Sequence, residues 1–180
     1  MDEQRCPWCG TDPLYVAYHD TEWGVPEFDS RALWEKLILD GFQAGLSWIT
    51  ILKRREGFRR AFENFEIKKV AKFDANKIED LMLNPEIIRN RAKIISAINN
   101  ANLVLDKGID LTSLIWSFAP KTRQTPKSNF TWLATSEESI ALSKALRKLG
   151  FSFVGPTTMY ALMQSSGLVK DHAPGCFRRD

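Results

Sequence analysis

Apolar residues recur along this chain at the three- and four-residue spacing of an α-helix, whereas the strict alternation of a half-buried strand is almost absent. Helix-capping residues such as Asp29, Ser47 and Asp74 precede several of these periodic stretches. Helices are expected at about residues 30–40, 47–65, 75–83, 86–105, 111–118, 136–149 and 156–166, with a loop at 119–134. The chain is therefore predicted to be all-α.

Length and composition exclude several classes of protein. The 180 residues suffice for one domain with a real core, and 44% hydrophobic with 26% charged residues is ordinary for a globular chain. Apolar runs of a few residues fall far short of the ~18 that indicate a membrane span. The charged N-terminus is not typical of a secretory signal, so a cytoplasmic location without a membrane partner is expected. A net charge of +3 permits a polyanionic partner without demanding one.

Cysteine and histidine residues gather near the two ends of the chain. Three cysteines are an odd number for a disulfide framework, and both histidines lie close to a cysteine. Thiolates and imidazoles are the usual ligands of structural zinc, and four of them close a tetrahedral site. The candidate ligands are Cys6, Cys9, His19, His172 and Cys176. The alternative interpretation is buried thiols and surface histidines.

Aromatic residues gather in the first fifty positions, beside acidic ones. Flat, electron-rich rings with a carboxylate suit a planar cationic ligand, because both favour positive charge. Packing of the rings in the core is the alternative interpretation. The aromatic residues are Trp8, Tyr15, Tyr18, Trp23 and Trp48, and the nearby carboxylates are Asp20, Glu22 and Asp40.

A glycine-bounded turn is expected between the last two helices. Thr135 to Glu138 fits a capping box for the first helix, Gly150 suits its left-handed end, and Pro156 suits the first turn of the second helix. Free backbone amides at such a turn can bind a phosphate without reading sequence. Ordinary helical hairpins look similar, so this pattern alone is weak. Phosphate-binding loops of the GxxxxGK type and nucleophile-elbow motifs are absent.

Together these motifs resemble the bacterial 3-methyladenine DNA glycosylase I family. The resemblance covers essentially the whole chain, in order. The matching segments are Arg5-Cys6-x-Trp8, Asp12 to Pro26 with its Tyr18-His19-Asp20 core, Gly41 to Leu52, Ile87 to Ile94, Leu142 to Leu146, Gly150 to Pro156 and Gly167 to His172.

The resemblance implies a fold and a cofactor. It implies an all-helical unit of the helix-hairpin-helix glycosylase superfamily over residues 1–180, with a helical body at 29–167 and a hairpin near 150–156. It also implies one structural Zn²⁺ that joins segments 1–28 and 168–180. The implied zinc ligands are Cys6, His19, His172 and Cys176. Cys9 competes with His19 for the fourth position, and the Tyr18-His19-Asp20 motif favours His19.

The resemblance also implies an activity. The protein would flip 3-methyladenine out of alkylated double-stranded DNA and hydrolyse its glycosidic bond, as a monomer, without a lyase step and with free 3-methyladenine as product. Asp40 would be the catalytic carboxylate, with Tyr15, Tyr18, Trp48, Trp8 and Trp23 around the base. The expected DNA contacts are Gly45, Leu46, Gly150, Phe151 and Gly155.

Two sequence features bear on these expectations. The family's pocket carboxylate is usually a glutamate, and Asp40 is one methylene shorter. A non-catalytic module that binds DNA or alkylated bases is therefore a second hypothesis, and a structural zinc domain with a protein partner is a third. Asp171 follows the hairpin's second helix, where related glycosylases carry a catalytic aspartate. Because Asp171 abuts the expected ligand His172, a structural role is predicted for it.

Overall fold

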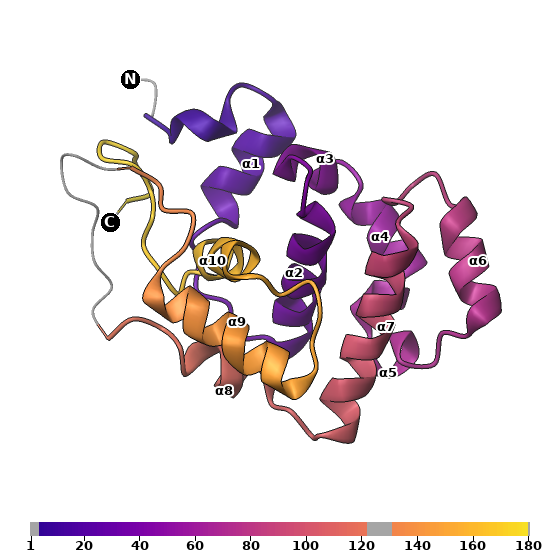
Figure 1. Ribbon diagram of the computed structural model, residues 1–180. Coiled ribbons are helices and arrows are strands. Elements are labelled where there is room, and N and C mark those ends of the chain that lie inside the picture. Colours follow the sequence, from indigo (N-terminus) through magenta and orange to yellow (C-terminus); the bar gives the residue numbers. More distant parts are fainter. Residues whose placement is uncertain (1–3, 122–130, 180) are drawn as a thin grey trace.

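A computed structural model describes residues 4–121 and 131–179 of the chain. Helices and turns account for its regular structure, and no strand occurs within these residues (Figure 1). The prediction of an all-α fold is therefore confirmed. None of the described helices is long and apolar enough to cross a membrane.

The helices follow one another along the chain, mostly with short connections. Within the described residues they are α1 (Pro13–Thr21), α2 (Ser30–Gln43), α3 (Trp48–Leu52), α4 (Arg55–Ala61), α5 (Ile67–Val70), α6 (Ala75–Leu83), α7 (Arg91–Asp106), α8 (Leu111–Trp116), α9 (Glu137–Leu149) and α10 (Pro156–Ser165), with 3₁₀ turns η1 (Pro7–Cys9) and η2 (Glu63–Phe65).

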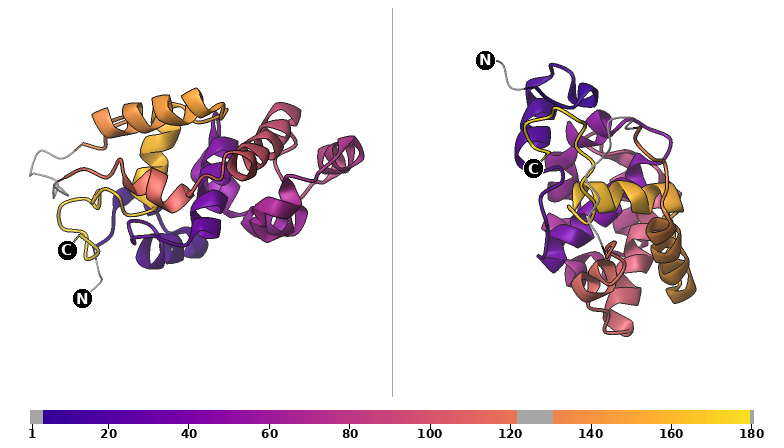
Figure 2. Two further views of the ribbon diagram at one scale, coloured as in Figure 1. Left: turned by 90° about the horizontal axis from the view of Figure 1, so that it is seen from below. Right: turned by 90° about the vertical axis from the view of Figure 1, so that its left-hand side faces the viewer.

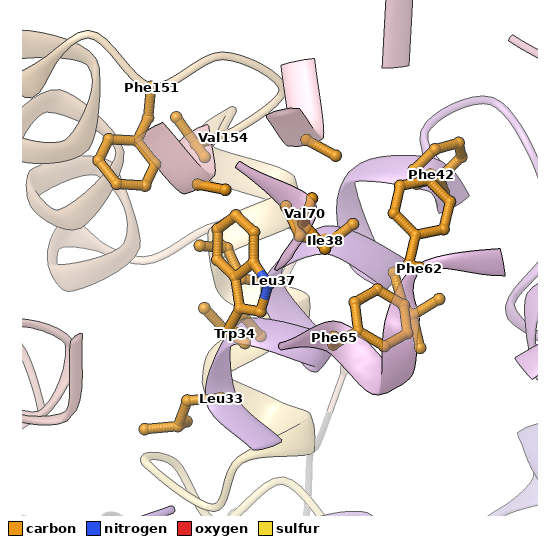
Figure 3. Close-up of a cluster of buried hydrophobic side chains, with 14 of the residues drawn as sticks. Leu33, Trp34, Leu37, Ile38, Phe42, Phe62, Phe65, Val70, Phe151 and Val154 are labelled. Atoms are coloured by element: carbon orange, nitrogen blue, oxygen red, sulfur yellow. The ribbon is translucent and has the colours of Figure 1, made fainter. Parts of the chain in front are cut away.

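Helix α2 lies at the centre of the molecule. It packs against α3, α8 and α10, while α9 packs along α10, and α7 packs against α5 and α6 (Figure 1). Figure 3 shows Trp34 and Leu37 of α2 on the side of Phe151 and Val154, with Phe62 on its other side. These side chains are almost fully buried, so α2 joins the two halves of one hydrophobic core.

Several helix starts are fixed by the side chains that the sequence suggested. The carboxylates of Asp29 and Asp74 each accept a hydrogen bond from a backbone N–H in the first turn of α2 and α6. At α9, Ser136 and Ser139 form a reciprocal capping box, one residue later than the expected Thr135 to Glu138 pair. Gly150 ends α9 in the left-handed conformation, as expected.

The expectation of one helix over residues 47–65 was wrong. The segment divides into α3, α4 and η2, because Arg54 leaves the helical conformation and residues Glu63, Asn64 and Phe65 all have positive φ angles. Helix α7 also begins at Arg91 and not at Glu86, since the Asn90 side chain accepts from Lys93 N–H and starts the helix there.

Two further segments bear on the expectations: one was not expected to be helical, and the other was expected to be a loop. Helix α1 was not expected, although Asp12 caps it and Pro13 occupies its first position. In the expected loop at 119–134, residues 119–121 and 131–134 are not helical, and 122–130 lie outside the described residues.

The first and last described segments lie side by side in all three views (Figures 1 and 2). The backbone N–H of Phe177 donates to the carbonyl of Gln4, at 2.9 Å. Cys6, Ala173 and Cys176 form a small buried cluster of their own, apart from the main core. The fold thus brings the two ends together. The expected division of the chain into a helical body at 29–167 and zinc-binding segments at 1–28 and 168–180 stays a prediction.

Candidate functional site

A cavity of about 360 Å³ lies where η1, α1, α2, α3 and α10 meet. Small-molecule sites commonly have volumes of this size. All five aromatic residues that the sequence singled out line it, so the fold does gather them. The lining residues are Trp8, Tyr15, Tyr18, Trp23, Asp40, Gln43, Trp48, Trp132, Leu133, Ala161, Gln164 and Ser165.

The aromatic rings support one another as the walls of this cavity. The ring centroid of Trp8 lies 5.0 Å from that of Tyr15 and 5.0 Å from that of Trp23. Tyr18 lies 5.5 Å from Trp48. Tilted contacts at these separations are favourable for aromatic pairs. The walls are therefore held in place before any ligand arrives.

Asp40 supplies the only carboxyl group among the described residues that line the cavity. It is 4% exposed, and its Oδ2 atom has no hydrogen-bond partner there. Burial raises the pKa of Asp40 to about 8, against a smaller opposing effect of the Lys36 charge. The indole Nε1 atoms of Trp8 and Trp48 are also buried and unpartnered in the described structure. Such atoms cost free energy until a ligand or water pairs with them, so the pocket is built for a polar planar ligand.

The raised pKa of Asp40 predicts a pH dependence of stability. The ordinary pKa is 3.8 and the folded value is about 8, so between these pH values the unfolded chain gives up a proton that the folded chain retains. The contribution of Asp40 to the free energy of unfolding is full below the unfolded pKa of 3.8. It is lost as pH rises from there to the folded pKa of about 8, by at most about 1.4 kcal/mol per pH unit. Denaturant unfolding from pH 5 to 7 should show a steeper fall for the wild type than for Asp40→Asn. Parallel curves would contradict the burial of this carboxyl.

The other two acidic residues near the aromatic cluster do not line the cavity. Asp20 accepts hydrogen bonds from Arg5, at 2.8 Å from one guanidinium nitrogen, and from His19 Nδ1, at 2.7 Å. Glu22 is paired with Arg55 at 2.6 Å and 2.8 Å. Both carboxylates therefore hold elements together, which leaves Asp40 as the carboxyl that faces the cavity.

Cys6, His19, His172 and Cys176 form one buried cluster next to the pocket, with their ligand atoms all within 4.8 Å of one another. The Sγ atoms of Cys6 and Cys176 lie 3.6 Å and 3.5 Å from His172 Nδ1, and Cys176 Sγ lies 3.4 Å from His19 Nε2. Tetrahedral zinc with bonds of about 2.3 Å to sulfur and 2.0 Å to nitrogen places such atoms about 3.5 Å apart. The donor set and its spacing fit zinc.

Hydrogen bonds on the far side of each imidazole fix which nitrogen faces the cluster. His19 Nδ1–H donates to Asp20, so Nε2 is the ring nitrogen without a proton, and its lone pair, which the backbone N–H of Cys6 approaches at 3.3 Å, is on the side of the cluster. His172 Nε2–H donates to the Trp23 carbonyl at 3.1 Å, which leaves Nδ1 for the cluster. Partners of this kind orient metal ligands in proteins.

Cys9 points away from the cluster. Its Sγ donates to the carbonyl of Cys6 at 3.2 Å, and it is not among the residues whose ligand atoms converge. The geometry therefore favours His19 over Cys9 as the fourth ligand.

Replacing Asp20 with asparagine should weaken metal binding without removing a ligand. The variant loses the charged acceptor that orients His19, and such losses typically lower metal affinity about 10- to 100-fold. Competition with a chromophoric chelator measures the change. An unchanged affinity would show that Asp20 serves only its ion pair with Arg5.

The turn between α2 and α3 exposes Leu46. Gly45 beside it has a φ of 82°, and open space surrounds the position of its missing Cβ. Glycine is thus needed here for backbone conformation and not for room. The expected DNA contacts Gly45 and Leu46 therefore form a projecting tip, called the insertion turn below (residues 43–47).

The hairpin turn (residues 150–155) presents backbone amides. The N–H groups of Gly150 and Phe151 donate to the carbonyls of Arg147 and Leu146 and so close α9. The N–H groups of residues 153–155 find no acceptor within the described part of the chain. Phe153 has a φ of 56°, and amides around such a left-handed residue can form an anion-binding concavity. Gly150 and Phe151 thus shape the turn, and residues 153–155, which include Gly155, offer the backbone N–H donors.

A model of the methyladenine glycosylase family matches residues 8–179. The chain belongs to the methyladenine glycosylase family. It is 50% identical to the DNA-3-methyladenine glycosylase of Haemophilus influenzae, over 96% of each chain. It is 48% identical to DNA-3-methyladenine glycosylase 1 of Escherichia coli, over 96% of this chain and 95% of that one.

Solved structures of the methyladenine glycosylase family have the same fold. A crystal structure of 3-methyladenine DNA glycosylase I superposes with a TM-score of 0.91 at 47% identity, over 97% of this chain and 98% of that one. A tyrosine-to-phenylalanine variant of such an enzyme, in complex with 3-methyladenine, has a TM-score of 0.89 at 34% identity, over 98% of this chain and 97% of that one.

Some pocket residues of this methyladenine glycosylase family member were not foreseen. Gln43, Trp132, Leu133 and Gln164 line the cavity. Asp171 supports this wall, because its carboxylate accepts from Gln164 Nε2 at 2.7 Å and its carbonyl accepts from Trp132 Nε1 at 3.1 Å. These contacts fit the structural role predicted for Asp171.

Proposed function

We propose that this protein is a DNA-3-methyladenine glycosylase, which hydrolyses the bond between 3-methyladenine and deoxyribose in alkylated DNA. The observation that carries the proposal is the aromatic pocket with the buried, unpartnered carboxyl of Asp40. It occurs in a chain half identical, over nearly its full length, to a protein with that activity in its name. The related structure with 3-methyladenine supports the same substrate.

The chemistry suits a pocket with so few ionisable groups. Adenine methylated at N3 carries a delocalised positive charge, which weakens its bond to deoxyribose. When the N9–C1′ bond breaks, its electron pair stays on the base, which leaves as a neutral molecule. Water then adds to C1′ and loses a proton to solvent. Strong acid catalysis is unnecessary, so the main tasks are to extrude the nucleotide and to bind the cationic base.

Asp40 and the aromatic rings divide the recognition of the base. The faces of Trp48 and the tyrosines attract a cationic ring. An ionised Asp40 attracts the same charge and accepts a hydrogen bond from the exocyclic amine. Because burial raises the Asp40 pKa to about 8, the empty site holds much of this carboxyl in its neutral form, and the incoming cation favours its ionisation. A neutral adenine gives no such gain, which explains selection for the alkylated base.

The insertion turn and the hairpin turn serve the DNA. We assign Leu46 and Gly45 to the space left by the flipped nucleotide, since they project from the surface beside the pocket. We assign the amides of residues 153–155 to the phosphate backbone, as expected for a helix-hairpin-helix motif. The action on double-stranded DNA, the absence of a lyase step, the monomeric state and the cytoplasmic location stay predictions.

We further propose that Cys6, His19, His172 and Cys176 hold one structural Zn²⁺. The bound ion would join the segment before α1 to the segment after α10 and so close a loop of nearly the whole chain. The Trp8 ring packs 5.3 Å from the ring of His19, and the Trp23 carbonyl accepts from His172, so the metal site would also anchor two walls of the pocket.

Survival of bacteria under alkylation tests the proposed function in the cell. Expression of this chain in a strain that lacks its own 3-methyladenine glycosylases should restore growth in methyl methanesulfonate. The Asp40→Asn variant, expressed to the same level, should not. If a well-expressed, metal-loaded wild type gave no protection, the chain would be better described as a binding module for DNA or alkylated bases.

A further inference from the structure

One face of α7 carries three polar residues that are buried. Lys93, Ser96 and Asn100 follow one another at spacings of three and four, so they lie along the same side of the helix. Their exposed fractions are 7%, 5% and 2%. Burial of polar groups costs free energy unless each has partners, so what they bind indicates why they are there.

Lys93 binds the end of α2. Its Nζ donates to the carbonyls of Phe42 and Ala44, at 2.8 Å and 2.6 Å. Carbonyls in the last turn of a helix have no partner within the helix, and a lysine charge there is favourable. Gly45 and Leu46 follow directly, so Lys93 fixes the base of the insertion turn.

Asn100 and Ser96 bind the hairpin turn at Ser152. The Asn100 side chain accepts from Ser152 N–H at 3.1 Å and donates to the Ser152 carbonyl at 3.1 Å, so both backbone groups of this residue are held. Ser96 Oγ lies 2.7 Å from Ser152 Oγ and donates to the same carbonyl at 3.2 Å. The next three residues of the turn carry the unpartnered amides.

The hairpin turn also touches α2, just before the insertion turn begins. A Cβ on Gly41 of α2 would lie 3.4 Å from the Phe153 carbonyl oxygen, so a larger residue there would press on the hairpin turn. Figure 1 shows the connection from α9 to α10 with α2 on one side of it and α7 on the other. Both turns therefore rest on α7, and the hairpin turn meets α2 at a contact with little room for adjustment.

We propose that Lys93, Ser96 and Asn100 are positioning residues for duplex DNA, which set the separation between the insertion turn and the hairpin turn. The inference rests on the proposed function, because that assigns both turns to DNA. An insertion residue fills the gap in the base stack only if the phosphates are bound at a matching distance from it. A rigid frame between the two turns therefore lowers the conformational entropy that is lost when the protein binds DNA. None of the three residues lines the base pocket.

Two variants, their double variant and a matched control test this role. Lys93→Met removes the hydrogen bonds to the carbonyls of Phe42 and Ala44, and Asn100→Ala removes the two bonds from its amide to Ser152 but keeps those of Ser96. The control is Asn102→Ala on the same helix, where the amide donates to the carbonyls of Ala71 and Ile98, far from both turns in sequence. Ser96→Ala is a milder fourth single variant that loses only a hydroxyl. For each protein one measures melting temperature, affinity for free 3-methyladenine and affinity for a duplex with a stable abasic analogue.

We expect Lys93→Met and Asn100→Ala each to weaken duplex binding about tenfold, with non-additive effects in the double variant, because both act through one frame. Affinity for the free base should stay within about twofold, and Asn102→Ala should keep duplex affinity even if it melts at a lower temperature. The proposal would be wrong if Asn102→Ala lost as much duplex affinity, or if the variants lost affinity for the free base and the duplex equally. Either result would show that these residues serve only the stability of the core. If Asn100→Ala does not fold, Ser96→Ala decides by the same criterion. A wild type that neither binds the duplex nor releases base would refute the proposed function itself.

Discussion

Asp40→Asn is expected to lower the release of 3-methyladenine from DNA by about 10²- to 10³-fold, the usual effect of removing one group that stabilises developing charge in an enclosed site. The amide has nearly the shape of the carboxyl but can never become an anion, so it loses the attraction for the cationic base. Single-turnover rates on methylated duplex DNA measure the loss. A variant with wild-type rates would show that the rings alone suffice.

The matched control for this prediction is Asp40→Glu. It keeps the charge and adds one methylene, so substantial activity should remain. The pH profile gives a second signature. With a pKa of about 8 in the empty pocket, the ionised fraction of Asp40 grows as pH rises from 6 to 8, so kcat/KM of the wild type should rise over that interval. The residual activity of Asp40→Asn should lack this rise.

Cys176→Ala is expected to give the second large effect, on metal content and on stability. The variant retains three of the four converging ligands, so zinc content should fall from one per chain to well below that after dialysis. Structural zinc contributes directly to folding free energy, and a loss on the order of 3 kcal/mol would lower the melting temperature by about 10 °C for a chain of this size. Metal analysis and calorimetry on the same samples measure both.

Cys9→Ser is the control for the metal site. Its hydroxyl can still donate to the Cys6 carbonyl, so metal content should match the wild type. Because Trp8 and Trp23 are anchored beside the cluster, Cys176→Ala should also bind free 3-methyladenine more weakly, whereas Cys9→Ser should not. Full zinc content in Cys176→Ala, with zinc lost in Cys9→Ser, would overturn the proposed ligand set.

Local signals in the sequence predicted the helices that have strong capping residues. Asp29, Asp74 and Gly150 mark boundaries that the structure retains, because each makes its contact within a few residues along the chain. The break between α3 and α4 has no proline or glycine, so nothing local announces it. The start of α7 at Arg91 depends on Asn90, whose cap is one of several weak polar signals in that stretch.

The residues of the candidate site likewise divide into those that the sequence could predict and those that only the fold reveals. Tyr15 and Tyr18 were recognisable because they lie in a short motif that matches a family, and Asp40 because it directly precedes another such motif, Gly41 to Leu52. Trp132 and Gln164 reach the cavity from distant segments, and only the fold places them there. The orientation of His19 by Asp20 was also beyond the sequence, although the two residues are adjacent, because it depends on which ring nitrogen faces the cluster.

The most direct test of the account is to identify the bases that the purified protein releases from methylated duplex DNA. With DNA in excess, mass spectrometry should detect 3-methyladenine well beyond one molecule per protein molecule, and no 7-methylguanine. Release that stops at or below one base per protein molecule, or that yields both bases alike, would contradict the proposal that this pocket selects and excises 3-methyladenine.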